Sequence, residues 1–246
     1  MKAVVLAAGK GTRMKEITDA IPKPMVEVGG RPMLWQVLTA LGRAGVEDVA
    51  VIVGYKADVI RDYFGDGSDV GVSVSYFTQE TQDGTGRAAD PAREFLSDGP
   101  FFFTFGDILT EPEAYRQMAE AFRREETDLL LAVRTVDDPY KGAAVYVRDG
   151  LVERLVEKPP QGTSSTNYIN AGIFVTRPVL FEYTAKLELS ERGEYEIPDA
   201  IRMMIADGLA VRTFELADYW RDVGTPEDLA AAGEDAREKR GLVGDE

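Results

Sequence analysis

Residues 3–13 read AVVLAAGKGTR, an apolar run that passes directly into a glycine-rich turn with two basic side chains. A short continuous apolar run bounded by glycine predicts a buried β-strand over residues 3–8. The glycines let backbone N–H groups approach a phosphate or a base edge closely, while Lys10 and Arg13 add positive charge. Because glycines after a strand are also common turn formers, the stretch by itself leaves a binding role open.

Apolar runs alternate with segments of helical period from this strand to about residue 138. This βαβ rhythm predicts a mostly parallel sheet. The continuously apolar run at 101–105 is typical of a strand buried on both faces, and the alternating run at 72–76 of a half-exposed strand. Further strands are expected at 49–53 and 129–133, and helices at 33–44, 58–64 and 112–125.

After Asp138 strands follow strands, beginning with a hairpin predicted around Asp149-Gly150 from the runs at 144–148 and 152–156. Later strands are expected at 171–175 and 211–216, and helices at 201–206 and 226–239. We therefore expect an α/β protein of Rossmann-like fold, with a mostly parallel central sheet and a β-rich second half. A single domain is expected over residues 1–240, followed by a frayed tail at 241–246.

The composition excludes several classes of function. The 246 residues carry a formal charge of −15, which argues against a binder of nucleic acid or of anionic membranes. The chain has no cysteine and no histidine, so thiolate catalysis and the commonest catalytic base are absent. Its chemistry must rely on carboxylates, Lys, Arg, backbone amides and hard cations. No apolar stretch approaches 18 residues, and a cytoplasmic protein without a membrane partner is expected.

Basic residues gather at the N-terminus of this acidic chain. Residues 1–31 hold six basic against three acidic side chains, a local charge of +3. Within them Pro22-Lys23-Pro24 fixes the backbone around one lysine and so lowers the entropy of presenting its ammonium. The alternative is a rigid surface turn with a solvated lysine. A dinucleotide fingerprint would need glycine where Met14 stands, and the spacing of a P-loop is not met.

Two aspartates are candidates for a magnesium site. Asp107 follows the buried run 101–105, at the carboxyl end of a central strand, where open α/β sheets bind ligands. Asp222 precedes the turn Val223-Gly224-Thr225 that leads into the last helix. Mg²⁺ usually binds one or two carboxylates together with phosphate oxygens, so the two can share one ion. Each is also a common type of cap or turn residue.

Four weaker signals lie further along the chain, and each has a plain structural alternative. Glu157-Lys158-Pro159 stiffens a second lysine but also suits an exposed hairpin edge. Gln79, with Asp83-Gly84-Thr85-Gly86 placed before an expected helix, offers an amide for a base edge but also suits a capped turn. Asn170 suits sugar hydroxyls or the start of a strand. Glu194 and Glu196 fit a solvated loop better than a sugar site.

In order and spacing these segments resemble the sugar-1-phosphate nucleotidylyltransferases, also called nucleotide-sugar pyrophosphorylases. The resemblance runs from Met1 to about Leu229. It is carried by eight segments: LAAGKGTRM at 6–14, PKPM at 22–25, Gly54-Tyr55, Gln79 with Gly84-Thr85, Gly106-Asp107, Glu157-Lys158-Pro159, Asn170-Ala171-Gly172 and WRDVGT at 220–225.

The resemblance implies a role for each matching residue. It places Mg²⁺ on Asp107 and Asp222, Arg13, Lys23 and Lys158 at the phosphates as catalytic groups, and nucleoside triphosphate and sugar-1-phosphate as substrates. The nucleotide-binding set is Leu6, Ala8, Gly9, Gly11, Thr12, Arg13, Gln79, Gly84, Thr85 and Asp107. The sugar-phosphate set is Gly142, Glu157, Lys158 and Asn170. The C-terminal β-helix domain of longer members is expected to be absent, and a homo-oligomer stays open.

The base and two rival functions also stay open. Gly84-Thr85-Gly86 stands where many uridylyl- and thymidylyl-transferring members have Gly-Thr-Ala or Gly-Leu-Ala. UTP or dTTP is favoured, with a CTP- or GTP-dependent member as the alternative. From another class, a nucleotide-sugar sensor would have lost a phosphate-handling residue, yet Arg13, Lys23 and Lys158 all remain. A metal-dependent glycosyltransferase would place two aspartates around one residue, unlike Gly106-Asp107-Ile108.

Overall fold

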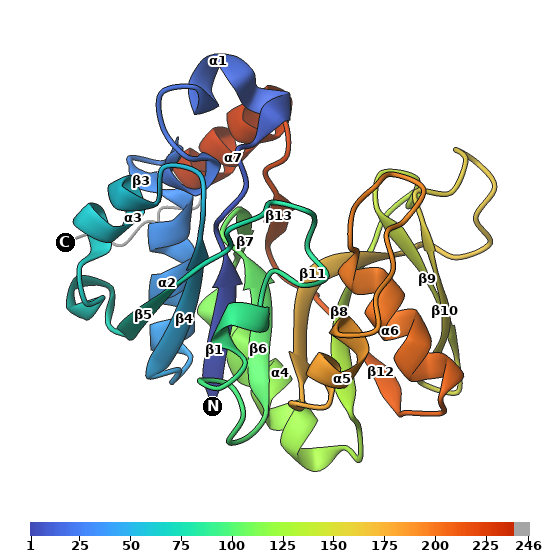
Figure 1. The fold of residues 1–246 in the computed structure, drawn as a ribbon. Coiled ribbons are helices and arrows are strands. Elements are labelled where there is room, and N and C mark those ends of the chain that lie inside the picture. The colour runs from blue at the N-terminus through green and yellow to red at the C-terminus, as the bar shows by residue number, and fades with distance from the viewer. Residues whose placement is uncertain (239–246) are drawn as a thin grey trace. The chain divides into compact units, whose positions relative to one another are not determined.

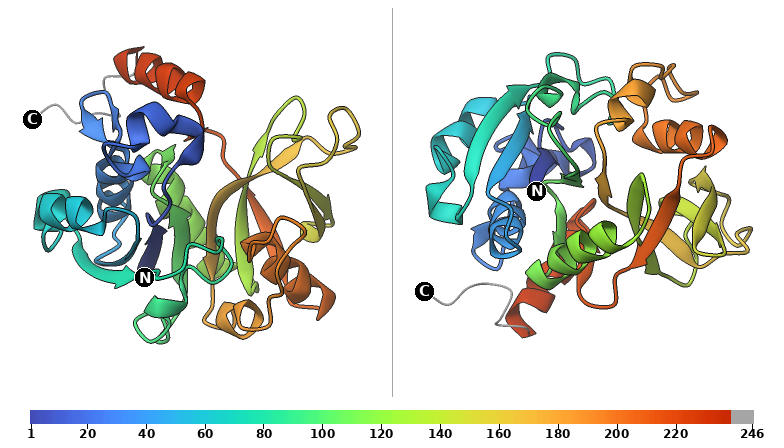
Figure 2. Two further views of the ribbon diagram at one scale, coloured as in Figure 1. Left: turned by 45° about the horizontal axis from the view of Figure 1, so that its top comes forward. Right: turned by 90° about the horizontal axis from the view of Figure 1, so that it is seen from below.

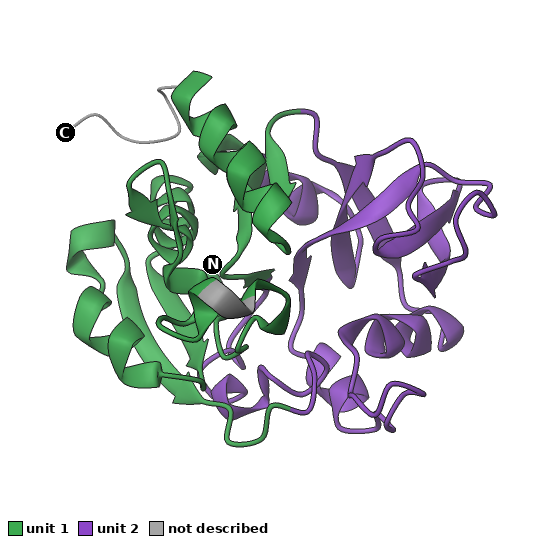
Figure 3. Ribbon diagram, turned by 90° about the horizontal axis from the view of Figure 1, so that it is seen from above, with its two compact units in different colours: residues 1–82, 104–116, 218–246 green, residues 83–103, 117–217 purple. Residues whose placement is uncertain are grey.

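The structure is a computed structural model that describes residues 1–238, with the backbone alone at residues 15 and 16. It contains two compact units (Figure 3), each assembled from several chain segments. Unit 1 comprises residues 1–82, 104–116 and 218–246, and unit 2 comprises residues 83–103 and 117–217. The single domain over 1–240 stays a prediction, and the expected tail at 241–246 lies outside the described residues.

Unit 1 is built on the parallel strands β1 (Lys2–Leu6), β4 (Asp48–Val53) and β5 (Ser73–Thr78), hydrogen-bonded in the order β5-β4-β1 (Figure 1). Helix α2 (Met33–Arg43) connects β1 to β4, and α3 (Ala57–Phe64) connects β4 to β5. The apolar run that opens the chain is buried, with Ala3, Val4 and Val5 fully inaccessible to solvent. This unit therefore has the predicted βαβ arrangement.

The next strand, β6 (Phe101–Phe105), ends beside β1, where the Gly106 N–H donates to the Leu6 carbonyl at 2.9 Å. Strand β7 (Ile108–Thr110) follows and pairs antiparallel with β13 (Trp220–Asp222). Helix α4 (Pro112–Arg124) comes next in the chain, and α7 (Pro226–Glu238) follows β13. The carboxyl ends of β1 and β6 therefore lie next to the strand pair that carries Asp222.

Unit 2 contains a mixed sheet in the order β6-β11-β8-β12-β10-β9. Its strands are β8 (Leu129–Thr135), β9 (Ala143–Arg148), β10 (Leu151–Glu157), β11 (Tyr168–Thr176) and β12 (Val211–Glu215). Strands β12 and β8 pair in parallel, whereas β10–β12, β10–β9, β11–β6, β11–β8 and β11–β9 pair antiparallel. Helices α5 (Leu180–Thr184) and α6 (Ile197–Ala206) pack together, and α6 lies against β10 and β12 (Figures 1 and 2).

Two expectations need correction. The prediction of a mostly parallel sheet holds only for unit 1. The strands of the β-rich second half pair mainly antiparallel, so parallel and antiparallel pairs both occur. The helix expected after Gly86 is also absent from the described residues, where only the 3-10 turn η4 (Asp90–Ala92) forms. Pro91 lacks the N–H that a continuing helix requires. The hairpin prediction is confirmed, with Asp149 and Gly150 both at positive φ.

No helix within residues 1–238 has the length and apolar composition needed to cross a membrane.

Candidate functional site

The glycine-rich turn after β1 is closed by hydrogen bonds of its own. The Thr18 hydroxyl, fully buried, donates to the carbonyls of Gly11 at 3.0 Å and Met14 at 3.1 Å. Gly11 has φ +69°, and a Cβ there would lie 2.8 Å from Cβ of Lys23. Glycine is therefore required at position 11, and the turn lies directly against the lysine of the Pro-Lys-Pro segment.

Lys23 is the most closely held of the predicted phosphate-binding residues. It begins the short 3-10 helix η2 (Lys23–Met25), is only 8% exposed and forms an ion pair with Asp107. Pro24 packs beside Gly106, because a Cβ at Gly106 would lie 3.1 Å from Cβ of Pro24. The alternative of a solvated surface lysine is thus wrong, since this ammonium is buried against a carboxylate.

Asp222 lies close to Asp107 although 115 positions separate them in the sequence. Asp222 is opposite Ile108 in the β7–β13 pair, and the next N–H, from Val223, donates to the Asp107 carbonyl at 3.1 Å. Desolvation by the surrounding protein, and then the charge of Asp107, raise the pKa of Asp222 to about 6. Solvent still reaches the Asp222 side chain, so the crowded carboxylate remains accessible to a ligand.

Arg13 completes this basic and acidic cluster of unit 1. Its guanidinium lies 3.2 Å from the place where a Cβ of Gly224 would stand, and it is among the charges that favour ionisation of Asp222. Arg13 is exposed, unlike Lys23. The structure therefore brings Gly11, Arg13, Lys23, Asp107 and Asp222 together at the carboxyl ends of β1 and β6.

The residues of this cluster fit a magnesium ion. The charge of Asp107 adds to the cost of ionising Asp222, and a divalent cation would offset that cost. Mg²⁺ takes one or two carboxylates with phosphate oxygens and waters. Within the described part of the chain, no group of three or more Asp, Glu, His or Cys side chains has a metal-binding arrangement. The remaining ligands would come from the substrate and from water, as Mg²⁺ prefers.

The rest of the predicted nucleotide set lies around the same strand ends or in unit 2. The N–H of Tyr55 donates to the carbonyl of Ala8 at 3.1 Å, and the N–H of Gln79 to the carbonyl of Val53 at 2.9 Å. Gly9 and Thr12 are exposed. Gln79 belongs to unit 1, and Gly84 and Thr85 to unit 2, so their shared role at a base stays a prediction.

In unit 2, Glu157 and Lys158 line a cavity of about 510 Å³ at the end of β10. Lys158 has φ +43°, a left-handed conformation that is rare for a lysine and strained before a proline. Its N–H donates to the carbonyl of Gly142 at 3.0 Å, which unites three of the predicted sugar-phosphate residues. Burial raises the pKa of Glu157, while Arg192 and Lys158 oppose that rise.

Asn170, the fourth residue of that set, does not line this cavity. It lies in β11 at a β-bulge, and its side-chain oxygen accepts from the N–H of Gly172 at 2.8 Å. Gly172 has φ +74°, as the bulge requires. Asn170 lies near the start of β11, as the structural alternative expected, and its contact with a sugar stays a prediction.

Arg192 is a cavity residue that the sequence analysis missed. Its guanidinium donates a hydrogen bond of 3.0 Å to Glu196, forms an ion pair with the same carboxylate at 2.8 Å and lies 3.6 Å from Glu157. Hydrogen bonding from Arg192 is the largest cause that lowers the pKa of Glu196, which is 6% exposed. The expected solvated loop is therefore wrong for Glu196. An arginine four residues before a glutamate was the available signal.

Lys56 is a second missed residue, in unit 1. It has φ +50°, and its ammonium donates to the carbonyls of Asp19 and Ala20, each at 2.6 Å. These carbonyls directly follow α1 (Lys15–Thr18), so Lys56 holds the segment that closes the glycine-rich turn. Its sequence signal was weak, because a lysine after Gly54-Tyr55 is ordinary for a surface turn.

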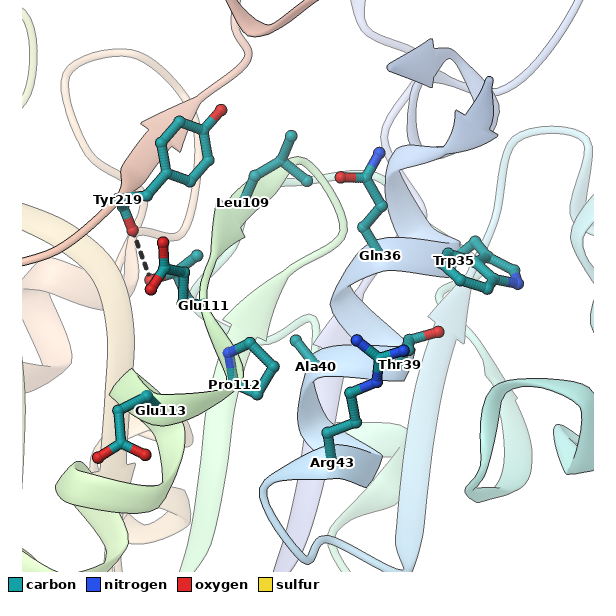
Figure 4. A pocket seen from close by; sticks show the side chains of 11 residues that line it. Trp35, Gln36, Thr39, Ala40, Arg43, Leu109, Glu111, Pro112, Glu113 and Tyr219 are labelled. Atoms are coloured by element: carbon teal, nitrogen blue, oxygen red, sulfur yellow. Dashed lines mark hydrogen bonds between the residues drawn. The ribbon is translucent and has the colours of Figure 1, made fainter. Parts of the chain in front are cut away.

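Unit 1 has another cavity, of about 490 Å³, which contains none of the predicted residues. Figure 4 shows Trp35, Gln36, Thr39 and Arg43 of α2 on one side and Leu109, Glu111, Pro112 and Tyr219 on the other. Thr110 also lines this cavity, and its hydroxyl donates to the carbonyl of Tyr219, another lining residue, at 2.8 Å. This cavity is distinct from the Asp107–Asp222 cluster.

Comparison with known proteins decides the family. Residues 2–239 match the family model described as nucleotidyl transferase. The chain is a member of the nucleotidyl transferase family. It is 35% identical over 253 residues to the low-salt glycan biosynthesis nucleotidyltransferase Agl11 of Haloferax volcanii, covering all of this chain and 70% of that protein. It is 34% identical to the UTP–glucose-1-phosphate uridylyltransferase AglF of the same organism, covering 97% of this chain and 98% of AglF.

Other family members are longer, and a solved structure shares the fold. The chain spans about half (53%) of the bifunctional GlmU protein of Methanococcus maripaludis, at 34% identity over 94% of this chain. The crystal structure of a putative glucose-1-phosphate thymidylyltransferase from Bacillus anthracis matches with a TM-score of 0.87 and 26% identity, covering 97% of this chain and 96% of that one. The α/β nucleotidyltransferase fold is thereby established, with a mixed sheet.

Proposed function

We propose that this family member transfers a nucleoside monophosphate from a nucleoside triphosphate to a sugar-1-phosphate and releases pyrophosphate. The observation that carries the proposal is the cluster of Arg13, Lys23, Asp107 and Asp222 at the carboxyl ends of β1 and β6. It joins two cations suited to phosphates with two carboxylates suited to Mg²⁺. The names of AglF and of the Bacillus anthracis protein support the same reaction, with UTP or dTTP as donor.

The chain's residues act mainly by positioning two anions that repel each other. A sugar phosphate dianion is already a competent nucleophile at neutral pH, so the absence of histidine is no obstacle. Two unit charges ~4 Å apart repel by about 4 kcal/mol at an effective dielectric of 20, which corresponds to about a thousandfold in rate. Arg13 and Lys23 offset this repulsion at the triphosphate, and Lys158 and Arg192 offset it at the sugar-borne phosphate.

The proposed site has three parts. Leu6, Ala8, Gly9, Gly11 and Thr12 form the turn under the triphosphate, whereas Gln79, Gly84 and Thr85 meet the base. Gly142, Glu157, Lys158 and Asn170 meet the sugar phosphate. Asp107 and Asp222 hold Mg²⁺, which when bound would neutralise phosphate charge. The order β5-β4-β1, with β6 ending beside β1, supports the description of unit 1 as Rossmann-like. A cytoplasmic location and a homo-oligomer remain predictions.

The proposal is tested by pyrophosphate release from five nucleoside triphosphates, each combined with a panel of sugar-1-phosphates. We expect release only when both substrates and Mg²⁺ are present, and most rapidly with UTP or dTTP. A preference for CTP or GTP would correct the base and leave the reaction intact. Tight binding of a nucleotide sugar without any release would instead favour a sensor.

A further inference from the structure

Residues 83–86 run directly alongside residues 195–197 in unit 2. Gly84 and Tyr195 form a parallel β-bridge, flanked by the Tyr195 N–H donating to the Asp83 carbonyl at 2.7 Å and the Gly86 N–H donating to the Tyr195 carbonyl at 2.8 Å. The N–H of Ile197, the first residue of α6, donates to the Thr85 hydroxyl at 3.2 Å. The segment proposed to meet the base is thus hydrogen-bonded to the start of α6.

This close approach explains why both flanking positions are glycine. Gly84 has φ +117°, and a Cβ there would lie 2.2 Å from the Tyr195 carbonyl oxygen. A Cβ at Gly86 would lie 2.5 Å from Cδ1 of Leu187 and 2.9 Å from the nitrogen of Glu196. Gly86 is therefore required by the packing of this chain.

Arg87 follows residues 83–86 directly and contacts both Tyr195 and the chain near the end of α5. Its guanidinium lies 3.9 Å from the centre of the Tyr195 ring, within the range of a cation–π contact. The same group donates to the carbonyl of Thr184, the last residue of α5, at 3.3 Å and to the carbonyl of Leu187, just after that helix, at 2.7 Å. One half-buried side chain thus contacts the C-terminal end of α5, the segment after it and the segment before α6.

The segment held by Arg87 also carries the charged residues of the cavity beside Glu157. Arg192 and Glu196 flank Tyr195 in sequence, and Arg192 lies 3.6 Å from Glu157. Tyr195 is therefore adjacent to the proposed base residues on one side and to a cation of the proposed sugar-phosphate site on the other. A shift of Tyr195 would move both.

We propose that Arg87 is a positioning residue that fixes Gly84-Thr85 and the Arg192–Glu196 segment relative to each other, so that its loss weakens binding of both the nucleoside triphosphate and the sugar-1-phosphate. The inference rests on the proposed function for its substrates. Arg87 itself contacts Tyr195 and backbone carbonyls, and it has no place in the chemical step.

The test compares Arg87→Gln and Arg87→Lys with the control Arg93→Gln. Arg93 is also an arginine that donates to an α5 carbonyl, that of Phe181 at 3.1 Å, and lies over an aromatic ring, that of Phe181 at 5.2 Å, but its ion pair is with Asp90. Steady-state kinetics would give KM for each substrate and kcat, and thermal melting would show that the variants fold.

For Arg87→Gln we expect KM for both substrates to rise about tenfold while kcat falls less than about threefold, because ground-state positioning is lost. Lysine keeps the charge over the ring but lacks the planar fork, so Arg87→Lys is expected to have intermediate KM values. Arg93→Gln is expected to leave both KM values within about twofold of the wild type. KM values for Arg87→Gln that match those of Arg93→Gln would overturn the proposal.

Hydrogen–deuterium exchange keeps the inference testable if no substrate pair is found. Arg87→Gln is expected to increase exchange at residues 83–86 and 190–197 together, and Arg93→Gln is not. Unchanged exchange at either segment would refute the positioning role. A wild-type protein that releases no pyrophosphate would refute the proposed function alone, so the two failures are distinguishable.

Discussion

At the scale of single residues, the contact between Lys23 and Asp107 is the feature on which the site depends. Asp107→Asn removes the carboxylate beside a buried ammonium and one of two proposed magnesium ligands. We expect turnover to fall by at least ~10²-fold, by analogy with the loss of one electrostatic stabiliser. The melting temperature should also fall, because an unpaired buried charge destabilises the fold. Asp62→Asn, at an exposed position of α3, is the matched control.

Asp222 gives a prediction about pH. Its folded-state pKa is raised to about 6 from 3.8, so ionisation destabilises the native state as the pH rises from about 4 to 6, and this destabilisation persists above pH 6. Without divalent cations, Asp222→Asn should therefore raise the melting temperature at pH 7.5 and change it little at pH 4. Equal effects at both pH values would show that the pKa of Asp222 is not raised in the folded protein.

The sequence allowed the residues of this cluster to be identified, but not their burial or their ion pairs. Asp107, Asp222, Lys23 and Arg13 could be singled out because prolines, glycines and strand ends mark them locally. The burial of Lys23 could not be predicted, because it depends on Asp107, which lies 84 positions away. Arg192 was missed for a similar reason, since its contact is with Glu157 at the end of β10, 35 positions earlier in the chain.

At the scale of elements, α7 begins with a capping box that follows Asp222 directly. The carboxylate of Asp228 accepts from the N–H groups of Gly224 at 3.1 Å and Thr225 at 2.9 Å, and the Asp228 N–H donates to the Thr225 hydroxyl at 3.2 Å. Asp228→Ala should lower the free energy of unfolding by ~1 kcal/mol, as for other lost caps. Chemical denaturation would measure this, with the neighbouring exposed Glu227→Ala as a control that leaves stability nearly unchanged.

Two glycine-to-alanine substitutions should have opposite effects. Gly84→Ala places a methyl against the Tyr195 backbone at a positive φ and should lower both stability and nucleotide binding. Gly233→Ala, inside α7 with nothing within 4 Å, should raise stability by up to ~1 kcal/mol through helix propensity. Thermal melting and a nucleotide titration of both variants would check this. A stable, fully active Gly84→Ala variant would contradict the account of residues 83–86.

Long apolar runs and turn residues allowed most elements to be predicted. The buried strand at 101–105, the helices at 33–44 and 112–125 and the Asp149-Gly150 hairpin agree with the structure to within a few residues. The β7–β13 pair was not predicted, because strands of three residues have too little periodicity to be detected. The helix predicted after Gly86 was wrong. Pro91 lacks the N–H that a helix continuing through it requires, and the prediction considered only Gly84-Thr85-Gly86.

For the whole molecule, the order of residues along the chain does not show which segments belong to which unit. Unit 1 is assembled from three separated segments, the last of which returns after about 100 residues in unit 2 to deliver Asp222 beside Asp107. Local patterns describe neighbours in the chain, so this return was visible only through resemblance to a family. The overall charge of −15 likewise conceals a local basic group suited to phosphates.

Pyrophosphate release by the wild type and by Lys23→Met, measured with the preferred nucleoside triphosphate and sugar-1-phosphate, would show whether the buried ammonium serves the proposed transfer. We expect wild-type release to require both substrates, and the variant to be at least ~10²-fold slower because it lacks the buried ammonium beside the phosphates. A variant as fast as the wild type would show that Lys23 does not act on the phosphates, and wild-type release that proceeds equally well without the sugar phosphate would refute the proposed transfer.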